Sequence, residues 1–212
     1  MDKIRKWHYT CKAEKMVNKL KEKHYDAYLA NDLNEAKKIV NDIIPEEASI
    51  ALGGSITLNE MGLVEFFREG SYELYDRYNQ PSWPDTVECM RQSMLADYLV
   101  TGTNAITKNG ELINNDCTGN RVAGMIFGPK EVVIIAGVNK IVPTIEDGFK
   151  RLKDIAPLNV KRIGHKTPCI ESGECEDCQI PDRMCNYTTI IHHGMKFKNR
   201  IHIIMVADEV GY

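Results

Sequence analysis

The chain has 212 residues, of which 43% are hydrophobic and 27% charged, and its formal net charge is −3. These values predict a single globular domain over 1–212 with one sizeable core. They give no support for a nucleic-acid partner, because no long basic stretch is present. No apolar run approaches the roughly 20 residues that span a bilayer. The first residues also lack the apolar core of a signal peptide, so we expect a cytoplasmic protein with no membrane partner.

Residues 11–30 and 32–44 are predicted to form two helices, paired as a helical hairpin over 11–44. In the first segment, apolar residues recur at helical spacing among lysines and glutamates. In the second, Asp32 followed by Glu35 matches an N-cap with its reciprocal acid. We expect the apolar stripe of this hairpin to pack on the body of the protein. Contact with a second copy in a homo-oligomer is the alternative.

Short apolar runs alternate with amphipathic segments over 48–157. Strands are predicted at 49–52, 72–77, 97–102 and 131–138, with a hairpin at 105–114 around an Asn-Gly turn. Helices are predicted after 55 to about 68, from 84 to about 95, over 118–129 and from 143 to about 155. Two last strands are expected at 188–193 and 200–206, within 187–207. This alternation predicts a Rossmann-like α/β domain with a mainly parallel sheet.

Three loops are expected to leave strands at the carboxyl edge of that sheet, where open α/β sheets bind ligands. In the first loop, paired Gly53 and Gly54 let the backbone approach a ligand, and the following helix points its amides at the same space. Ser55 and Thr57 add hydroxyl donors. This pattern favours a pocket for a phosphate or a carboxylate. The alternative is a tight turn in which Ser55 or Thr57 caps the helix.

The other two loops and the helix at 118–129 supply further candidates. The expected ligand-binding residues are Gly53, Gly54, Ser55, Thr57, Gly102, Thr103, Asn104, Asn120, Arg121 and Lys140. Arg121 can hold a carboxylate with two donors, although a structural ion pair is commoner, and Lys140 is either a ligand for an anion or a solvated lysine. Glu60 and Asp116 are the acid–base candidates, with helix-dipole and capping roles as the alternatives. The sequence contains neither a dinucleotide fingerprint nor a P-loop, so it establishes no nucleotide cofactor.

Cys169, Cys175, Cys178 and Cys185 lie in the predicted loop 167–186, spaced as Cys-x5-Cys-x2-Cys-x6-Cys. Two residues between the central pair permit a tight turn with both sulfurs on one metal ion. Four thiolates match a tetrahedral zinc ion or an all-cysteine iron–sulfur cluster, and the spacing does not distinguish them. Reduced structural thiols and a disulfide or redox switch are the alternatives. The odd total of seven cysteines disfavours a closed disulfide framework.

Three stretches resemble the LUD (lactate-utilisation) domain family, namely LGGSITLNEMGL (52–63), TGTNAITKNGELINNDCTGNRVAGMIFGP (101–129) and VNKIVPTIEDGFKRLKDIAP (138–157). The segment CEDCQIPDRMCN (175–186) looks like the tail of a single-domain branch of that family. The resemblance implies a fold similar to ribose-5-phosphate isomerase, CoA transferases and 5-formyltetrahydrofolate cyclo-ligase. It also favours the anion pocket, because the counterparts of the paired glycines in those enzymes face phosphate or similar groups.

The family takes its name from operons that oxidise L-lactate to pyruvate, in which one LUD protein accompanies iron–sulfur subunits. The resemblance therefore implies binding, and transformation by an unspecified reaction, of a small anionic metabolite in a lactate-utilisation-like pathway. The alternative is a non-enzymatic accessory subunit that uses the four cysteines as a zinc or iron–sulfur site and contacts redox partner proteins. A structural domain with a vestigial pocket is the third hypothesis.

Overall fold

The computed structural model describes residues 2–212 and contains a six-stranded sheet in which every neighbouring pair of strands is parallel. The strand order is β1-β10-β7-β4-β2-β3. The strands are β1 (Asp26–Ala30), β2 (Ser49–Leu52), β3 (Glu73–Tyr75), β4 (Tyr98–Gly102), β7 (Glu131–Gly137) and β10 (Ile201–Val206). The predicted Rossmann-like α/β architecture with a mainly parallel sheet is confirmed.

A second, four-stranded sheet lies beside the first and has the order β8-β5-β6-β9. Its strands are β5 (Ala105–Thr107), β6 (Leu112–Asp116), β8 (Ile141–Val142) and β9 (Tyr187–Ile191). The predicted hairpin is present as the antiparallel β5–β6 pair, and Gly110 supplies the left-handed conformation (φ 90°) that its turn needs. The sequence predicted a strand at 188–193 but not its partner. In the structure this strand, β9, pairs antiparallel with β6 in the second sheet and does not join the parallel sheet.

The central strand β7 shows how the two faces of the large sheet are filled. Successive side chains of a strand point to opposite faces. Val133 and Ile135 accordingly share a cluster with buried side chains of α2 (Leu33–Ile43) and α4 (Leu63–Glu69). Val132 and Ile134 share another with those of α1 (Lys3–Glu22). The same strand thus joins both layers of the core.

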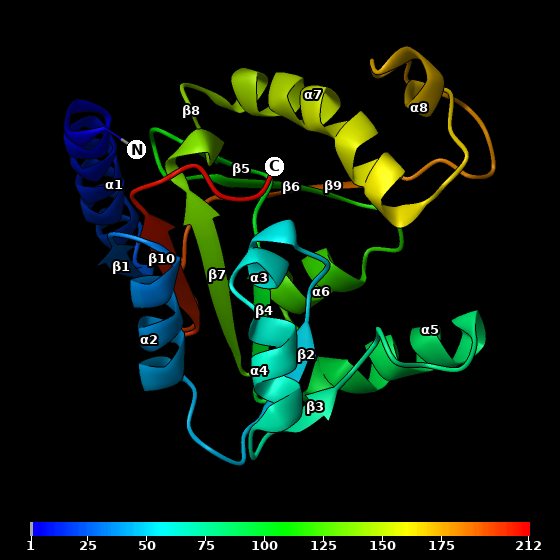
Figure 1. The fold of residues 1–212 in the computed structure, drawn as a ribbon, viewed down its shortest axis with the longest axis horizontal. Coiled ribbons are helices and arrows are strands. Elements are labelled where there is room, and N and C mark those ends of the chain that lie inside the picture. The colour runs from blue at the N-terminus through cyan, green and yellow to red at the C-terminus, as the bar shows by residue number, and fades with distance from the viewer. Residues whose placement is uncertain (1) are drawn as a thin grey trace.

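The remaining helices cover the second sheet and the ends of the strands. Figure 1 shows α7 lying along the second sheet, with α8 and the orange cysteine-rich loop beyond one end of α7. Their bounds are α3 (Ile56–Glu60), α5 (Trp83–Gln92), α6 (Asn120–Ile126), α7 (Ile145–Ile163) and α8 (Cys169–Ser172), with short 3₁₀ turns at η1 (Ser93–Leu95) and η2 (Val138–Lys140). None of the helices in the described chain combines the length and the hydropathy that crossing a bilayer requires.

The predicted helical hairpin over 11–44 is wrong. Helix α1 begins at Lys3 rather than near residue 11, and it ends at Glu22. His24 then adopts a left-handed conformation with φ 62°, which stops the helix. The following residues form β1, which pairs with β10 at the edge of the parallel sheet. Pairing with β10, near the other end of the chain, therefore determines the conformation of these residues, although their apolar side chains recur at helical spacing.

Two predicted helix boundaries also differ. The helix expected after residue 55 is divided into α3 and α4 by Gly62, whose φ is 61°. Helix α7 continues through Pro157 to Ile163, past the predicted end near residue 155. Buried Ala156 and Val160 extend its apolar face, so packing outweighs the hydrogen bond that Pro157 cannot donate. This extension brings the last turn of α7 to the site described below.

Candidate functional site

A pocket of about 160 Å³ lies where β2, β4 and β6 end, between these strands and α7. The loops after β2, β4 and β7, which the sequence placed at the carboxyl edge of the sheet, all contribute to its lining. Nine of the predicted ligand-binding and acid–base residues line it: Gly54, Ser55, Gly102, Thr103, Asn104, Asp116, Asn120, Arg121 and Lys140. The structure therefore brings together groups that are far apart in the sequence.

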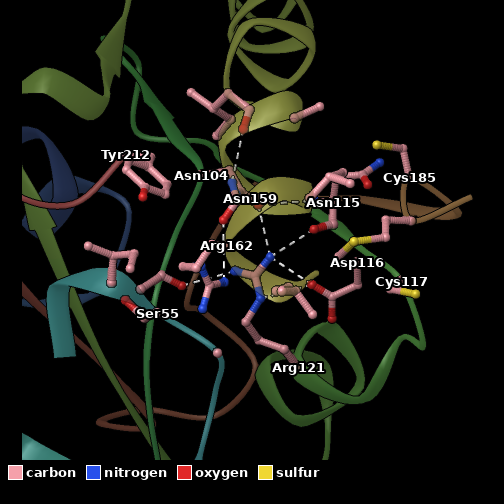
Figure 2. Close-up of a pocket in the computed structure, with 18 of the residues that line it drawn as sticks. Ser55, Asn104, Asn115, Asp116, Cys117, Arg121, Asn159, Arg162, Cys185 and Tyr212 are labelled. Carbon is pink, nitrogen blue, oxygen red and sulfur yellow. Dashed lines mark hydrogen bonds and ion pairs between the residues drawn. The ribbon is translucent and has the colours of Figure 1, made fainter. Parts of the chain in front are cut away.

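Arg121 is the centre of a hydrogen-bond network (Figure 2). Its Nε donates to Asp116 Oδ1 at 2.8 Å. One terminal nitrogen donates to Gly102 O and to Asn114 Oδ1, and the other to Asn104 Oδ1 and to Asn115 O. These five bonds match the five N–H groups of a guanidinium. Arg121 thus uses its donors to hold the pocket together, which is the structural ion-pair alternative.

Asp116 is buried and both of its carboxylate oxygens are occupied. Oδ1 accepts from Arg121, and Oδ2 accepts from the backbone N–H of Val122 at 2.9 Å. The second contact ties the carboxylate to the first turn of α6, where negative charge is favoured. This is the capping alternative, and proton transfer by Asp116 requires release of one of these contacts.

Lys140 follows β7 and is buried, with 4% of its surface exposed. Its Nζ lies 3.3 Å from the hydroxyl oxygen of Thr57, so its hydrogen bond is to a neutral group. Burial, together with the positive charges of Arg151 and Arg121, lowers the pKa of Lys140 to about 7, and Glu60 opposes this shift. Lys140 is therefore a buried amine that titrates near pH 7 rather than the solvated lysine that the sequence allowed.

Two further arginines line the pocket and were not predicted. Arg162 comes from the last turn of α7, and Arg77 follows β3. The Arg162 Nε is buried without a hydrogen-bond partner in residues 2–212, and one of its terminal nitrogens makes a long contact of 3.4 Å with Asn159 Oδ1. Burial lowers the pKa of Arg162. The sequence feature that could have identified Arg162 is the apolar face of α7, because this face continues beyond the predicted end of that helix.

The two opposite sides of the pocket carry different chemical groups. In Figure 2, Ser55 and Tyr212 lie on one side, Asp116, Cys117 and Cys185 lie on the other, and Arg121 and Arg162 lie between them. Ser55 is the N-cap residue of α3, yet its side chain makes no capping hydrogen bond. Its hydroxyl is therefore not committed to the capping role that was the alternative in the sequence.

Gly53, Thr57 and Glu60 do not line the pocket. A Cβ at Gly53 would lie 2.2 Å from Thr101 Oγ1, so this glycine permits the close packing of two strands. Thr57 is fully buried beneath Lys140. Glu60 accepts a hydrogen bond from the backbone N–H of Gly211 at 2.9 Å and so anchors the C-terminal segment. The acid–base roles of Glu60 and Asp116 stay predictions.

Each of the seven cysteines is a free thiol. The four cysteines of the predicted metal motif, Cys169, Cys175, Cys178 and Cys185, line one small cavity beside the pocket. Burial raises the pKa of the Cys185 thiol, and the neighbouring cysteines add to this shift. Among residues 2–212, no three His, Cys, Asp or Glu side chains already stand in the geometry of metal ligands.

Comparisons with known proteins identify the family of this chain and solved structures that are similar to it. A family model described as LUD domain matches residues 13–206 of the chain. The chain is also similar to the crystal structure of a DUF162 family protein from Deinococcus radiodurans, with 12% sequence identity and a TM-score of 0.47. That match covers 95% of this chain and 97% of the other. No curated protein matches the chain.

Proposed function

The chain belongs to the LUD domain family, and we propose that its pocket binds a small anionic metabolite that carries a carboxylate or a phosphate group. A lactate-related carboxylate is the first candidate, because the family is associated with lactate utilisation. The volume of about 160 Å³ suits a small metabolite rather than a dinucleotide. We also place the protein in the cytoplasm, which the absence of a disulfide bond among the seven cysteines of residues 2–212 supports.

The charge of the lining supports this proposal. Asp116 is the single carboxylate side chain among the lining residues. Arg121 neutralises its charge through an ion pair, in which Arg121 Nη2 lies 2.7 Å from Asp116 Oδ1. Three other cationic side chains, Arg77, Lys140 and Arg162, line the same space. The pocket therefore carries an excess of positive charge, which attracts an anion.

One observation carries the proposal: Lys140 is buried, and its ammonium contacts a hydroxyl instead of a carboxylate. A buried charge is costly unless a partner of opposite sign accompanies it. The unpaired Arg162 Nε adds a second buried donor without an acceptor. An anion between these two groups supplies the missing partner, and Ser55 adds a hydroxyl donor.

Lys140 is also our candidate for proton transfer in any reaction at this site. Its pKa of about 7 lies near the working pH, where a general acid or base is most effective. A lysine of lowered pKa also reaches the neutral form that attacks carbonyl carbons. Both roles require the bound anion to place a proton or a carbonyl group beside Nζ.

Titration calorimetry with L-lactate, pyruvate and inorganic phosphate tests the proposal. We expect saturable binding of at least one of these anions, with a Kd of about 1 mM or tighter, a free energy of roughly −4 kcal/mol. Arg162→Gln should weaken binding at least about tenfold, because it removes a charge-assisted hydrogen bond. Arg91→Gln, which alters an exposed arginine of α5, is the matched control. Equal affinities for the two variants would contradict this placement of the anion.

A further inference from the structure

The strongest additional feature is the convergence of four cysteines on one cavity outside the anion pocket. Cys169 comes from α8, and Cys175, Cys178 and Cys185 come from the loop that follows it. The cavity measures about 20 Å³, which accommodates one water-sized particle and so suits a single ion. Four cysteine sulfurs are the ligands of a closed structural zinc site. We propose that these four cysteines bind one zinc ion as a tetrathiolate.

Two features of the loop, a tight turn and one bridging side chain, bring the cysteines towards one another. Asp177, between Cys175 and Cys178, has a left-handed conformation with φ 49°, which tightens the turn that carries the two sulfurs. Arg183 donates to Cys178 O at 2.6 Å and to Cys185 O at 3.1 Å. One side chain therefore joins the central pair to the last cysteine, although the loop has no regular secondary structure of its own.

Among the charged residues that line the cavity, Arg183 opposes the negative charge of a zinc–thiolate centre, whereas Glu176 and Asp177 add to it. When zinc binds, the four thiols release their protons to solvent, and the four thiolates and Zn²⁺ form a centre of net charge −2. Arg183 places a positive charge beside Cys178 and Cys185 and forms an ion pair with Asp177. The sulfurs must close to about 2.3 Å from a common centre. Because no helix or strand constrains residues 173–186, the loop can contract around the ion.

The proposed zinc site adjoins the anion pocket. Met184 and Cys185 line both the cysteine cavity and the pocket. The backbone N–H of Asn186 donates to Asp116 O at 3.1 Å, which joins the end of the loop to the pocket edge. A bound ion therefore fixes one wall of the pocket. The zinc site itself stands without the proposed function, whereas its effect on ligand binding rests on that function.

Metal analysis of the full-length protein, purified anaerobically from cells supplied with zinc and iron, tests the inference. We expect one zinc ion per chain. Replacement by Co²⁺ should give the strong visible absorption of a tetrahedral thiolate centre. The double variant Cys175→Ser/Cys178→Ser should lose metal at least about tenfold, and the control Cys11→Ser, on the exposed side of α1, should retain it. Cys185→His should keep the metal with an altered Co²⁺ spectrum, because imidazole also binds zinc.

Several results would overturn the inference. Wild-type protein without a tightly held metal would do so, as would metal that persists in the double variant. A brown protein containing iron and sulfide would show that the site holds a cluster instead of a single ion. An unchanged Co²⁺ spectrum in Cys185→His would remove Cys185 from the ligand set. None of these measurements requires the anion ligand to be known, so they separate this inference from the proposed function.

Discussion

Replacement of Lys140 by methionine tests the buried cation directly. Lys140→Met keeps an unbranched side chain of similar length and removes the positive charge that faces the pocket. Because burial lowers the pKa of Lys140 to about 7, the wild-type ammonium loses its proton between pH 6 and pH 8. Anion binding favours the protonated form, so affinity should be highest below pH 7 and decrease above it. The bound anion in turn raises the pKa of Lys140 above its value in the free protein.

The size of the effect follows from the fraction of protonated lysine. For a pKa of about 7, this fraction falls from about 0.9 at pH 6 to about 0.09 at pH 8. If the charged form alone binds, the apparent Kd rises roughly tenfold over this interval. At pH 6, Lys140→Met should cost the charge-assisted hydrogen bond, about 1.5–3 kcal/mol, or roughly 10- to 150-fold in Kd.

Calorimetric titration with sodium sulfate at constant ionic strength measures both effects, because sulfate does not change its charge between pH 6 and pH 8. The neighbours that act on Lys140 are Arg121, Arg151 and Glu60, and they are unchanged in the variant. Lys150→Met removes an exposed lysine of α7 and should keep the wild-type pH dependence. Wild-type affinity that is equal at pH 6 and pH 8, or a pH dependence that survives in Lys140→Met, would refute the reasoning.

Two substitutions separate binding from folding. Gly54 has open space around its Cβ position, so Gly54→Val should preserve the melting temperature and abolish anion binding by filling the pocket. At Gly53, a Cβ atom would collide with Thr101. Gly53→Val should therefore destabilise the fold by about 3 kcal/mol in chemical denaturation. Equal stability of the two variants would be inconsistent with this packing. Arg121→Met should cost about 3–5 kcal/mol of unfolding free energy because it leaves Asp116 buried and unpaired. Adding Asp116→Asn to this variant should restore part of the loss. An Arg121→Met variant as stable as the wild type would contradict the structural role of Arg121.

Local patterns in the sequence were sufficient for the central strands and insufficient for the edge strand β1. The residues of β7 are almost all apolar and β-branched, and this composition has few structural outcomes other than a buried strand. The residues of β1 were predicted as helix because Ala27 and Tyr28 continue the spacing of α1. Their strand conformation depends on pairing with β10, and no local pattern reports a partner so distant in the chain.

The candidate site divides in the same way. Loops at strand ends could be predicted because parallel strands place their carboxyl ends at one edge. Arg162 could not, because Pro157 is a common helix terminator and the predicted helix ended before it. A structural ion pair of Arg121 was one of two alternatives in the sequence, and its partner, Asp116, is identified by the structure. Choosing between them required the positions of Asn104 and Asn114, which accept from Arg121 together with two backbone carbonyl groups.

Crystals of the protein grown with L-lactate or sulfate give the most direct test of the pocket. The account predicts density for an anion within hydrogen-bonding distance of Lys140 Nζ and of the Arg162 guanidinium, with Arg121 still bonded to Asp116. An anion bound elsewhere on the molecule, or a pocket that holds water alone at saturating ligand concentration, would contradict it.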